Sequence, residues 1–266
     1  MNKIQKVSLF GLFSLSLAVA ACSGQKGQNA VSASDSVAAN TISAGQVIAV
    51  DSSASYLSWK GFKPGGQHYG KLPVSAGELD LKDGVLRAGS VSIQMNGIIV
   101  EDLKPEDGGN KLKQHLESED FFDAAKYPEA RFELTNLPAE GIKATELTEL
   151  QGNLTLKDVT KNITIPIASV VADPTTGAYT ITSKTFTINR ADWNVKYGSK
   201  SFFTGLGDKF INDDIELSSF LRKLFIALII TKIQKAMMKK STVVCTKLPQ
   251  LRVMASLRTS PLAASV

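Results

Sequence analysis

Apolar and polar residues alternate between Gly152 and Ile167, and this alternation limits the fold more than any other feature of the chain. The apolar members are Leu154, Leu156, Ile163, Ile165 and Ile167. A period of two residues is typical of a strand with one buried and one exposed face. The segment therefore predicts two strands, joined by a bend at residues 158–162.

Similar short segments follow one another from about residue 46. They are residues 46–51, 55–62, 77–81, 85–95, 130–137, 168–188 and 213–217. Asp83-Gly84 and the sequence DPTTG (173–177) fall where tight turns are needed. Strands and helices do not alternate along the chain, so about eight or nine strands are expected to form an antiparallel sandwich or a closed barrel.

Residues 109–128 depart from the strand pattern. Leu112 and Leu116 lie four residues apart, as on one face of a helix. A short helix is predicted from about Asn110, and Pro128 prevents its continuation. Its apolar side is expected to cap one end of the barrel or sandwich.

The first 22 residues have the composition of a targeting segment. Lys3 and Lys6 precede an apolar run that is too short to span a membrane and ends in small residues before Cys22. This pattern resembles a bacterial lipobox, which implies a signal peptide over residues 1–21 and acyl chains such as palmitate on Cys22. The alternative is an ordinary secretory signal with an incidental cysteine. Cys22 is the sole cysteine of the first 244 residues and stands where the motif requires one, which favours the lipobox.

Residues 22–45 are rich in Ser, Ala, Gly and Asn and contain hardly any large apolar residue. Such a composition predicts a flexible tether. Ser23 after the cysteine goes, in lipoproteins of this kind, with sorting to the outer membrane. We therefore expect a lipid-anchored protein of the bacterial envelope, at the outer membrane and facing the periplasm.

The net charge of +5 is concentrated at the two ends of the chain. All 25 Asp and Glu residues lie in residues 23–218, together with 19 of the 30 Lys and Arg residues, so this part has a net charge of −6. Nucleic acid is therefore not an expected partner. The basic tail, residues 219–266, reads either as an amphipathic helix on anionic lipid or as non-native sequence. Loss of alternation at Ser218-Ser219 favours the second interpretation and predicts that the barrel ends at residue 218.

Five segments, in order, resemble the YceI family, also called polyisoprenoid-binding-protein-like. They are Trp59–Leu72, His115–Leu134 (HLESEDFFDAAKYPEARFEL), Gly152–Ile167, Phe186–Gly198 and Phe210–Leu217. The resemblance covers residues 46–218. It implies an all-β fold: an extended, lipocalin-like, antiparallel barrel of eight strands with one short helix. The characterised member of the family holds a long isoprenoid chain inside such a barrel.

A ligand of this kind requires only apolar inward faces, because burying its chain supplies the binding energy. The candidate lining residues are Val91, Ile93, Met95, Phe121, Phe122, Phe132, Leu134, Leu154, Leu156, Ile163, Ile165, Phe186, Ile188 and Trp193. An ordinary core, in which side chains pack only on one another, is the alternative for each. Phe121, Phe122 and Trp193 either gate the mouth or form a hydrophobic plug.

Arg190 and His115 are the candidate contacts for a ligand's head group. An arginine could meet a pyrophosphate in fork geometry; the alternatives are an ion pair of Arg190 with an acid such as Asp192 or Asp120, and a helix-end hydrogen bond for His115. His115 and His68 lack the spacing of metal ligands, so no metal is expected. The chain shows no motif for a catalytic serine, a reactive cysteine or a phosphate loop, so an enzyme is not expected.

The sequence thus predicts binding and sequestration, or carriage, of an amphiphilic isoprenoid-type lipid at the bacterial envelope. The alternative is a structural or stress-related envelope protein with a filled core and no ligand. No cofactor is expected apart from a bound isoprenoid lipid or quinone. The ligand's length, its head group and the oligomeric state remain open, with a homodimer among the alternatives.

Overall fold

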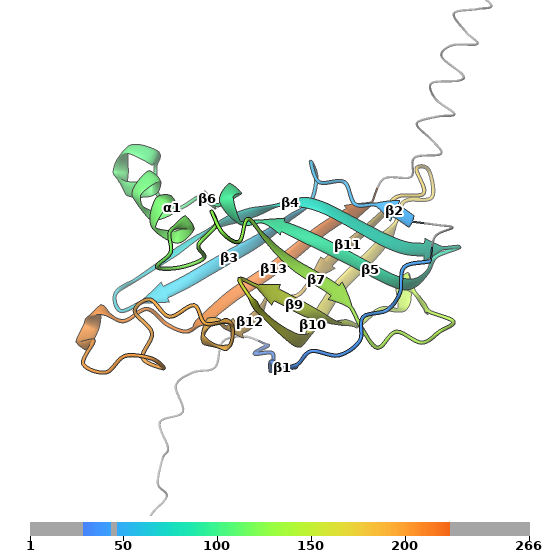
Figure 1. Ribbon diagram of the computed structural model, residues 1–266. Helices are drawn as coiled ribbons and strands as arrows, with labels where there is room; N and C mark the ends of the chain where they lie inside the picture. The colour runs from blue at the N-terminus through green and yellow to red at the C-terminus, as the bar shows by residue number, and fades with distance from the viewer. Residues whose placement is uncertain (1–28, 44–46, 224–266) are drawn as a thin grey trace, which may run out of the picture.

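The computed structural model describes residues 29–43 and 47–223 (Figure 1). Eight antiparallel strands form a closed barrel, because the order β4-β3-β13-β11-β10-β9-β7-β5 ends with β5 pairing back on β4. Their bounds are β3 Tyr56–Lys63, β4 Gly66–Lys82, β5 Val85–Gln94, β7 Glu129–Leu134, β9 Glu149–Leu156, β10 Val159–Ala172, β11 Tyr179–Ser183 and β13 Asp214–Lys223. The predicted all-β barrel is confirmed.

Shorter elements complete the architecture. The strands are β1 Ser34–Asp35, β2 Val47–Ala49, β6 Ile99–Val100, β8 Ile142–Lys143 and β12 Phe186–Asn189. The helical turns are η1 Met95–Gly97, η2 Pro105–Gly109, η3 Ala144–Glu146, η4 Arg190–Trp193 and η5 Gly207–Lys209. The predicted helix is confirmed as α1, Asn110–Glu117. No helix in the described part of the chain has the length and apolarity to cross a membrane.

Two hairpin turns show how local sequence sets the register of the barrel. Asp83 and Gly84 both have positive φ, 51° and 78°, which is the type I′ geometry that Asp-Gly pairs favour. The turn between β9 and β10 is similarly tight and contains Lys157 (φ 56°) and Asp158. The bend expected over 158–162 is therefore shorter than predicted, because residues 159–162 already pair with β9.

Half of the barrel interior is filled by side chains. The buried residues of this half include Leu79, Leu81, Leu86, Leu134, Leu150, Ile163, Ile167 and Ile181. Gly152 makes this packing possible, because a Cβ at that position would overlap the ring of Phe132. In this half of the barrel, the alternating apolar residues therefore form an ordinary core.

The N-terminal strap, residues 29–43, differs from the predicted flexible tether. β12 pairs with β13 but not with the first half of β10, so a gap opens between β10 and β12. The strap fills this gap: Ala30 bridges Thr187 of β12, and β1 pairs with residues 161–162 of β10. Its later part crosses the outside of the barrel, where Ala39 bridges Thr135 (Figure 1). The small size of its residues, read as a sign of flexibility, allows the strap to lie flat on the strands.

Buried polar side chains hold the strap in place. Asn153 accepts a hydrogen bond from Val37 N (3.2 Å) and donates one to Val37 O (2.6 Å). Asn162 donates to Asn153 Oδ1 (3.0 Å) and to Thr135 Oγ1 (3.0 Å). Asn162 is only 2% exposed. These amides point outward from the barrel, and the strap turns an outer face into a buried one.

Replacing Asn153 with alanine should therefore loosen the strap. The variant leaves the backbone groups of Val37 without their partner, and we expect the free energy of unfolding to fall by about 1–3 kcal/mol. Hydrogen exchange at the Val37 amide should accelerate in the same variant. Asn96→Ala is the control, because Asn96 of η1 is exposed and lies outside this hydrogen-bond network. Equal effects of the two substitutions would contradict this account.

The barrel also ends later than predicted. β13 continues past Ser218 to Lys223, and Phe220 stacks on Tyr56 of β3 with ring centroids 5.4 Å apart. The alternation at Ser218-Ser219 is lost without breaking the strand, since backbone pairing with β3 and β11 carries it on. The predicted tether residues 22–28 and 44–45, the signal peptide, Cys22 and the tail beyond residue 223 lie outside the described residues.

Candidate functional site: an apolar cavity at one end of the barrel

The other half of the barrel holds a cavity. Its unoccupied space, counted out to the opening and including solvent there, is about 1110 Å³. The lining residues are Leu57, Trp59, Gly61, Phe62, Lys63, His68, Leu72, Ile93, Met95, Ile98, Leu112, Leu116, Phe121, Phe122, Ala130, Leu154, Leu156, Ile188, Arg190, Ile211, Asn212, Ile215 and Leu217. Leu57 and Lys63 stand at the two ends of the β3 wall, which corresponds to about 20 Å along a strand.

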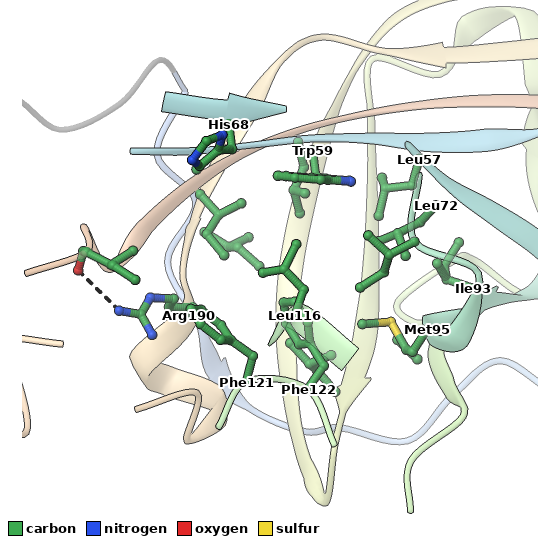
Figure 2. A pocket seen from close by; sticks show the side chains of 18 of the residues that line it. Leu57, Trp59, His68, Leu72, Ile93, Met95, Leu116, Phe121, Phe122 and Arg190 are labelled. Atoms are coloured by element: carbon green, nitrogen blue, oxygen red, sulfur yellow. Dashed lines mark hydrogen bonds between the residues drawn. The ribbon is translucent and has the colours of Figure 1, made fainter. Parts of the chain in front are cut away.

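Apolar side chains from opposite walls converge on this space (Figure 2). Trp59 comes from β3 and Leu72 from β4, and Leu116 of α1 and Phe122 close the side across from them. The helix thus covers one end of the barrel, as its apolar spacing predicts. Because few polar atoms face the interior, the cavity suits an apolar chain rather than water or an ion.

The charged and amide side chains of the lining gather at one end. Lys63 closes β3, His68 lies near the start of β4, and Arg190 and Asn212 flank β12 and β13. Lys63 and Asn212 are exposed. These residues mark the mouth of the cavity, while the deeper wall is apolar except for Trp59 Nε1, which is buried without a hydrogen-bond partner. A cavity with one polar end matches the shape of an amphiphile.

Half of the predicted lining residues contact the cavity. They are Ile93, Met95, Phe121, Phe122, Leu154, Leu156 and Ile188. The others do not line it and instead belong to the packed core or lie against it: Val91, Phe132, Leu134, Ile163, Ile165, Phe186 and Trp193. Alternation predicts which face of a strand is inward, but not which half of the barrel is filled.

Sequence reasoning missed the β3 wall, which contributes Leu57, Trp59 and Gly61. The alternation of this strand was visible in the sequence. Its role was hidden because a glycine stands at an inward position, where a Cβ would meet nothing within 4 Å. An inward glycine with empty space before it is a sign of a cavity that only the structure shows.

Arg190 lies at the cavity but its nitrogens are occupied. The side chain is 1% exposed. Nε donates to Asn212 O (3.1 Å), Nη1 to Val195 O (2.7 Å) and Nη2 to Ile211 O (3.1 Å; Figure 2 marks one of these bonds). Nη2 also lies 3.2 Å from Asp213 Oδ1. Burial lowers the pKa of Arg190, and the Asp213 carboxylate opposes this shift. The predicted ion pair with an acid is formed, but with Asp213 rather than Asp192 or Asp120.

His115 and Trp193 lie beside the cavity rather than in its wall. His115 Nε2 is 3.2 Å from Asp120 Oδ2, and its ring packs edge-on against Phe121 and Tyr197. Trp193 is fully buried and donates from Nε1 to Leu154 O (2.9 Å). Trp193 therefore acts as a plug in the core, the second of its two predicted roles.

His68 is the histidine that lines the mouth. Its Nδ1 lies 2.7 Å from Asp102 Oδ2, and Asp102 Oδ1 accepts a hydrogen bond from Tyr69 N (3.1 Å). Burial raises the pKa of Asp102, but the hydrogen bonds from His68 and Tyr69 outweigh it, so the net shift is downward. Because Nδ1 is engaged, Nε2 is the ring nitrogen left to meet a ligand.

The lowered pKa of Asp102 gives a pH dependence with a defined sign. The ionised carboxylate stabilises the fold fully above pH 3.8, the ordinary value, and loses this contribution as pH falls through the lower folded pKa. We expect Asp102→Asn to lower the free energy of unfolding at pH 6 and to make no difference near pH 2. Urea unfolding at both pH values tests this; a difference that persists in acid would contradict the assignment.

The acidic side chains near α1 differ in exposure: Glu117 is half-buried, and its Oε1 is buried without a hydrogen-bond partner. Glu119 and Asp120 follow α1 and are exposed. No group of three or more His, Cys, Asp or Glu residues in the described part of the chain is arranged to hold a metal ion.

Comparison with known proteins identifies related sequences. The model of the family described as "YceI-like domain" matches residues 48–221. A UPF0312 protein of Pseudomonas savastanoi pv. phaseolicola is 39% identical over 85 residues, which are 31% of this chain and 43% of that protein. A UPF0312 protein of Pseudomonas putida (strain W619) is 36% identical over the same shares. The aligned part spans less than half the length of these curated relatives.

Solved structures of similar fold include two with low sequence identity. Burkholderia cenocepacia BcnA is 18% identical, with a TM-score of 0.49, and the match covers 65% of this chain and 98% of BcnA. A polyisoprenoid binding domain from Saccharophagus degradans, implicated in plant cell wall breakdown, is 13% identical, with a TM-score of 0.48, and the match covers 66% of this chain and 97% of that domain.

Proposed function

This chain belongs to the family of YceI-like domains, and we propose that its barrel binds one amphiphilic molecule with a long apolar chain, of the isoprenoid type. The observation that carries the proposal is the elongated cavity in one half of the barrel, with apolar walls and with charged and amide side chains only at its mouth. A purely structural barrel would have an interior filled by side chains. Side chains fill only one half of this barrel, and the other half holds the cavity.

The apolar wall supplies the affinity. Each CH₂ group moved from water into such a wall contributes roughly 0.8 kcal/mol. A single five-carbon unit therefore contributes about 4 kcal/mol before the cost of ordering the chain. Tight binding needs no hydrogen bond in the interior, and the interior offers few polar atoms to form one.

The mouth supplies the contacts for a polar head group. Lys63, His68 and Asn212 present exposed or half-buried polar atoms there. Arg190 contributes charge, but its hydrogen bonds go to backbone carbonyls, so it supports the mouth instead of gripping a ligand. Of the head-group residues, we therefore assign the first contact to His68 and Lys63, and a supporting role to Arg190 and His115.

Sequestration is the mechanism that follows. The barrel shields an apolar chain from water for storage or carriage, and no bond is made or broken, so the protein acts as a binder rather than an enzyme. The lipobox-like sequence at Cys22 would tether the barrel to the outer membrane on its periplasmic side. Because residues 29–43 pack on the barrel, this part of the chain would not add to the reach of the tether.

Fluorescence of Trp59 tests the proposal, because this ring lines the cavity whereas Trp193 is buried in the core. Titration with a prenyl quinone should quench Trp59 and saturate at one ligand per chain. Trp59→Phe should remove most of the quenching, while Trp193→Phe should retain it. Absence of saturable quenching in the parent protein would refute the proposed function.

A further inference from the structure

The loop at residues 196–210, between η4 and β13, exposes aromatic side chains. Tyr197, Phe202 and Phe203 are 41%, 41% and 49% exposed. Leu206 and Phe210 are half-buried beside them. Single exposed apolar residues are common on proteins, but a group of them in one projecting loop marks a site of interaction.

Backbone hydrogen bonds brace the loop. Ser199 O accepts hydrogen bonds from Phe202 N (3.3 Å) and Phe203 N (3.0 Å), and Ile211 N donates to Gly198 O (2.8 Å). The two phenylalanines are thus presented to solvent by an ordered turn. Holding them there costs hydrophobic free energy, which contact with an apolar phase would return.

Lysines surround these aromatic rings. Lys196 Nζ lies 5.1 Å from the ring centroid of Phe202, and Lys200 Nζ lies 3.4 Å from that of Phe210. Lys209 is a third exposed cation, and Asp208 is the one acid within the loop. Aromatic rings flanked by lysines are typical of segments that rest in a membrane interface, with rings among the acyl chains and amines on anionic head groups.

The loop adjoins the mouth of the cavity. Ile211, which follows the loop directly, lines the cavity, and so does Arg190, the first residue of the preceding η4. The Tyr197 ring packs on Phe121, another lining residue, with centroids 5.2 Å apart. Figure 1 shows the loop, in orange, at the same end of the barrel as α1. The ring contact of Tyr197 with Phe121 therefore joins the start of the loop to the cavity wall.

We propose that the 196–210 loop docks the mouth of the barrel on an anionic lipid bilayer. Phe202 and Phe203 enter the interface while Lys196, Lys200 and Lys209 contact acidic head groups. The docking itself needs no ligand; its purpose, exchange of an apolar chain between bilayer and cavity without passage through water, rests on the proposed function.

A fluorophore beside the phenylalanines tests the docking. In the full chain with Cys22→Ser and Cys245→Ser, Thr204→Cys places an NBD label next to Phe203, and Thr175→Cys places one on the exposed β10–β11 turn at the opposite end. Vesicles of phosphatidylcholine with phosphatidylglycerol should shift the emission of the Thr204 label to the blue, and that of the Thr175 label should not move. No shift at Thr204, or equal shifts at both positions, would overturn the proposal and favour a protein partner.

Two sets of variants of the Thr204-labelled chain separate the contributions. Phe202→Ser with Phe203→Ser should abolish the shift. Lys196→Gln with Lys209→Gln should raise the vesicle concentration at half-shift at least tenfold at low salt, since each lysine near an anionic surface contributes about fivefold.

Lys82→Gln with Lys143→Gln, at the opposite end of the barrel, is the charge-matched control. This pair should leave the vesicle concentration at half-shift unchanged. An unchanged midpoint in the loop-lysine variant would overturn the electrostatic part. The docking assay contains no ligand and is therefore independent of the quinone titration. If the Thr204 label shifts to the blue but prenyl quinone does not quench Trp59, the proposed function is refuted and the docking stands.

Discussion

Gly61→Phe is expected to lower the affinity for an isoprenoid ligand by at least about 100-fold while leaving the barrel folded. Gly61 lies on β3 opposite His68 and Ile215, two residues that line the cavity. A Cβ there meets nothing within 4 Å, so a phenyl ring would enter the cavity without moving the backbone. Displacing four ligand carbons costs about 3 kcal/mol at roughly 0.8 kcal/mol each.

The matched control is Ser58→Phe, which adds the same ring to the outer face of the same strand. Titration of both variants with a prenyl quinone, followed by Trp59 fluorescence, measures the two affinities. Ser58→Phe should bind as the parent does. If Gly61→Phe also binds normally, the ligand does not occupy this cavity. The free energy of unfolding of Gly61→Phe should equal or exceed that of the parent, because the ring fills empty space.

Arg190→Met should produce the largest loss of stability, about 3–5 kcal/mol. The substitution keeps apolar volume but removes the donors to the carbonyls of Val195, Ile211 and Asn212, and leaves the Asp213 carboxylate without its cation. Unsatisfied buried acceptors and an unpaired buried charge each cost more than the bonds contribute when formed. Urea denaturation measures the change.

Arg131→Met is the control for this prediction. Arg131 pairs with Glu133 at 3.1 Å, but its side chain is 50% exposed. A surface ion pair of this kind contributes about 0–1 kcal/mol. Losses of similar size in the two variants would show that the Arg190 network does not hold the mouth together.

Local pattern predicted much of the fold. The Asp83-Gly84 turn and the helix from Asn110 both follow from chemistry within a few residues. The alternation of β9 and β10 placed Leu154, Leu156 and Ile163 on inward faces. What these patterns leave undetermined is the distribution of volume inside the closed barrel, which depends on side chains from all eight strands at once.

Two features lay beyond sequence reasoning for this reason. Gly61 and Gly152 are both inward glycines, yet one faces empty space and the other makes room for Phe132. The strap looked like a tether because its residues are small and polar. Its partners, Asn153 and Asn162, lie more than a hundred residues away and face outward, where polar residues on a strand ordinarily indicate solvent.

Mass spectrometry of bound lipid is the most direct test of the central claim. Residues 23–266, exported to the periplasm behind a cleavable signal peptide without an acylation site, can be purified without detergent and should release a prenyl lipid at about one molecule per chain on extraction with organic solvent. Gly61→Phe, purified in parallel, should release little or none. A parent protein that is stable, folded and free of lipid would contradict the account and show that the cavity is a packing feature of a structural barrel.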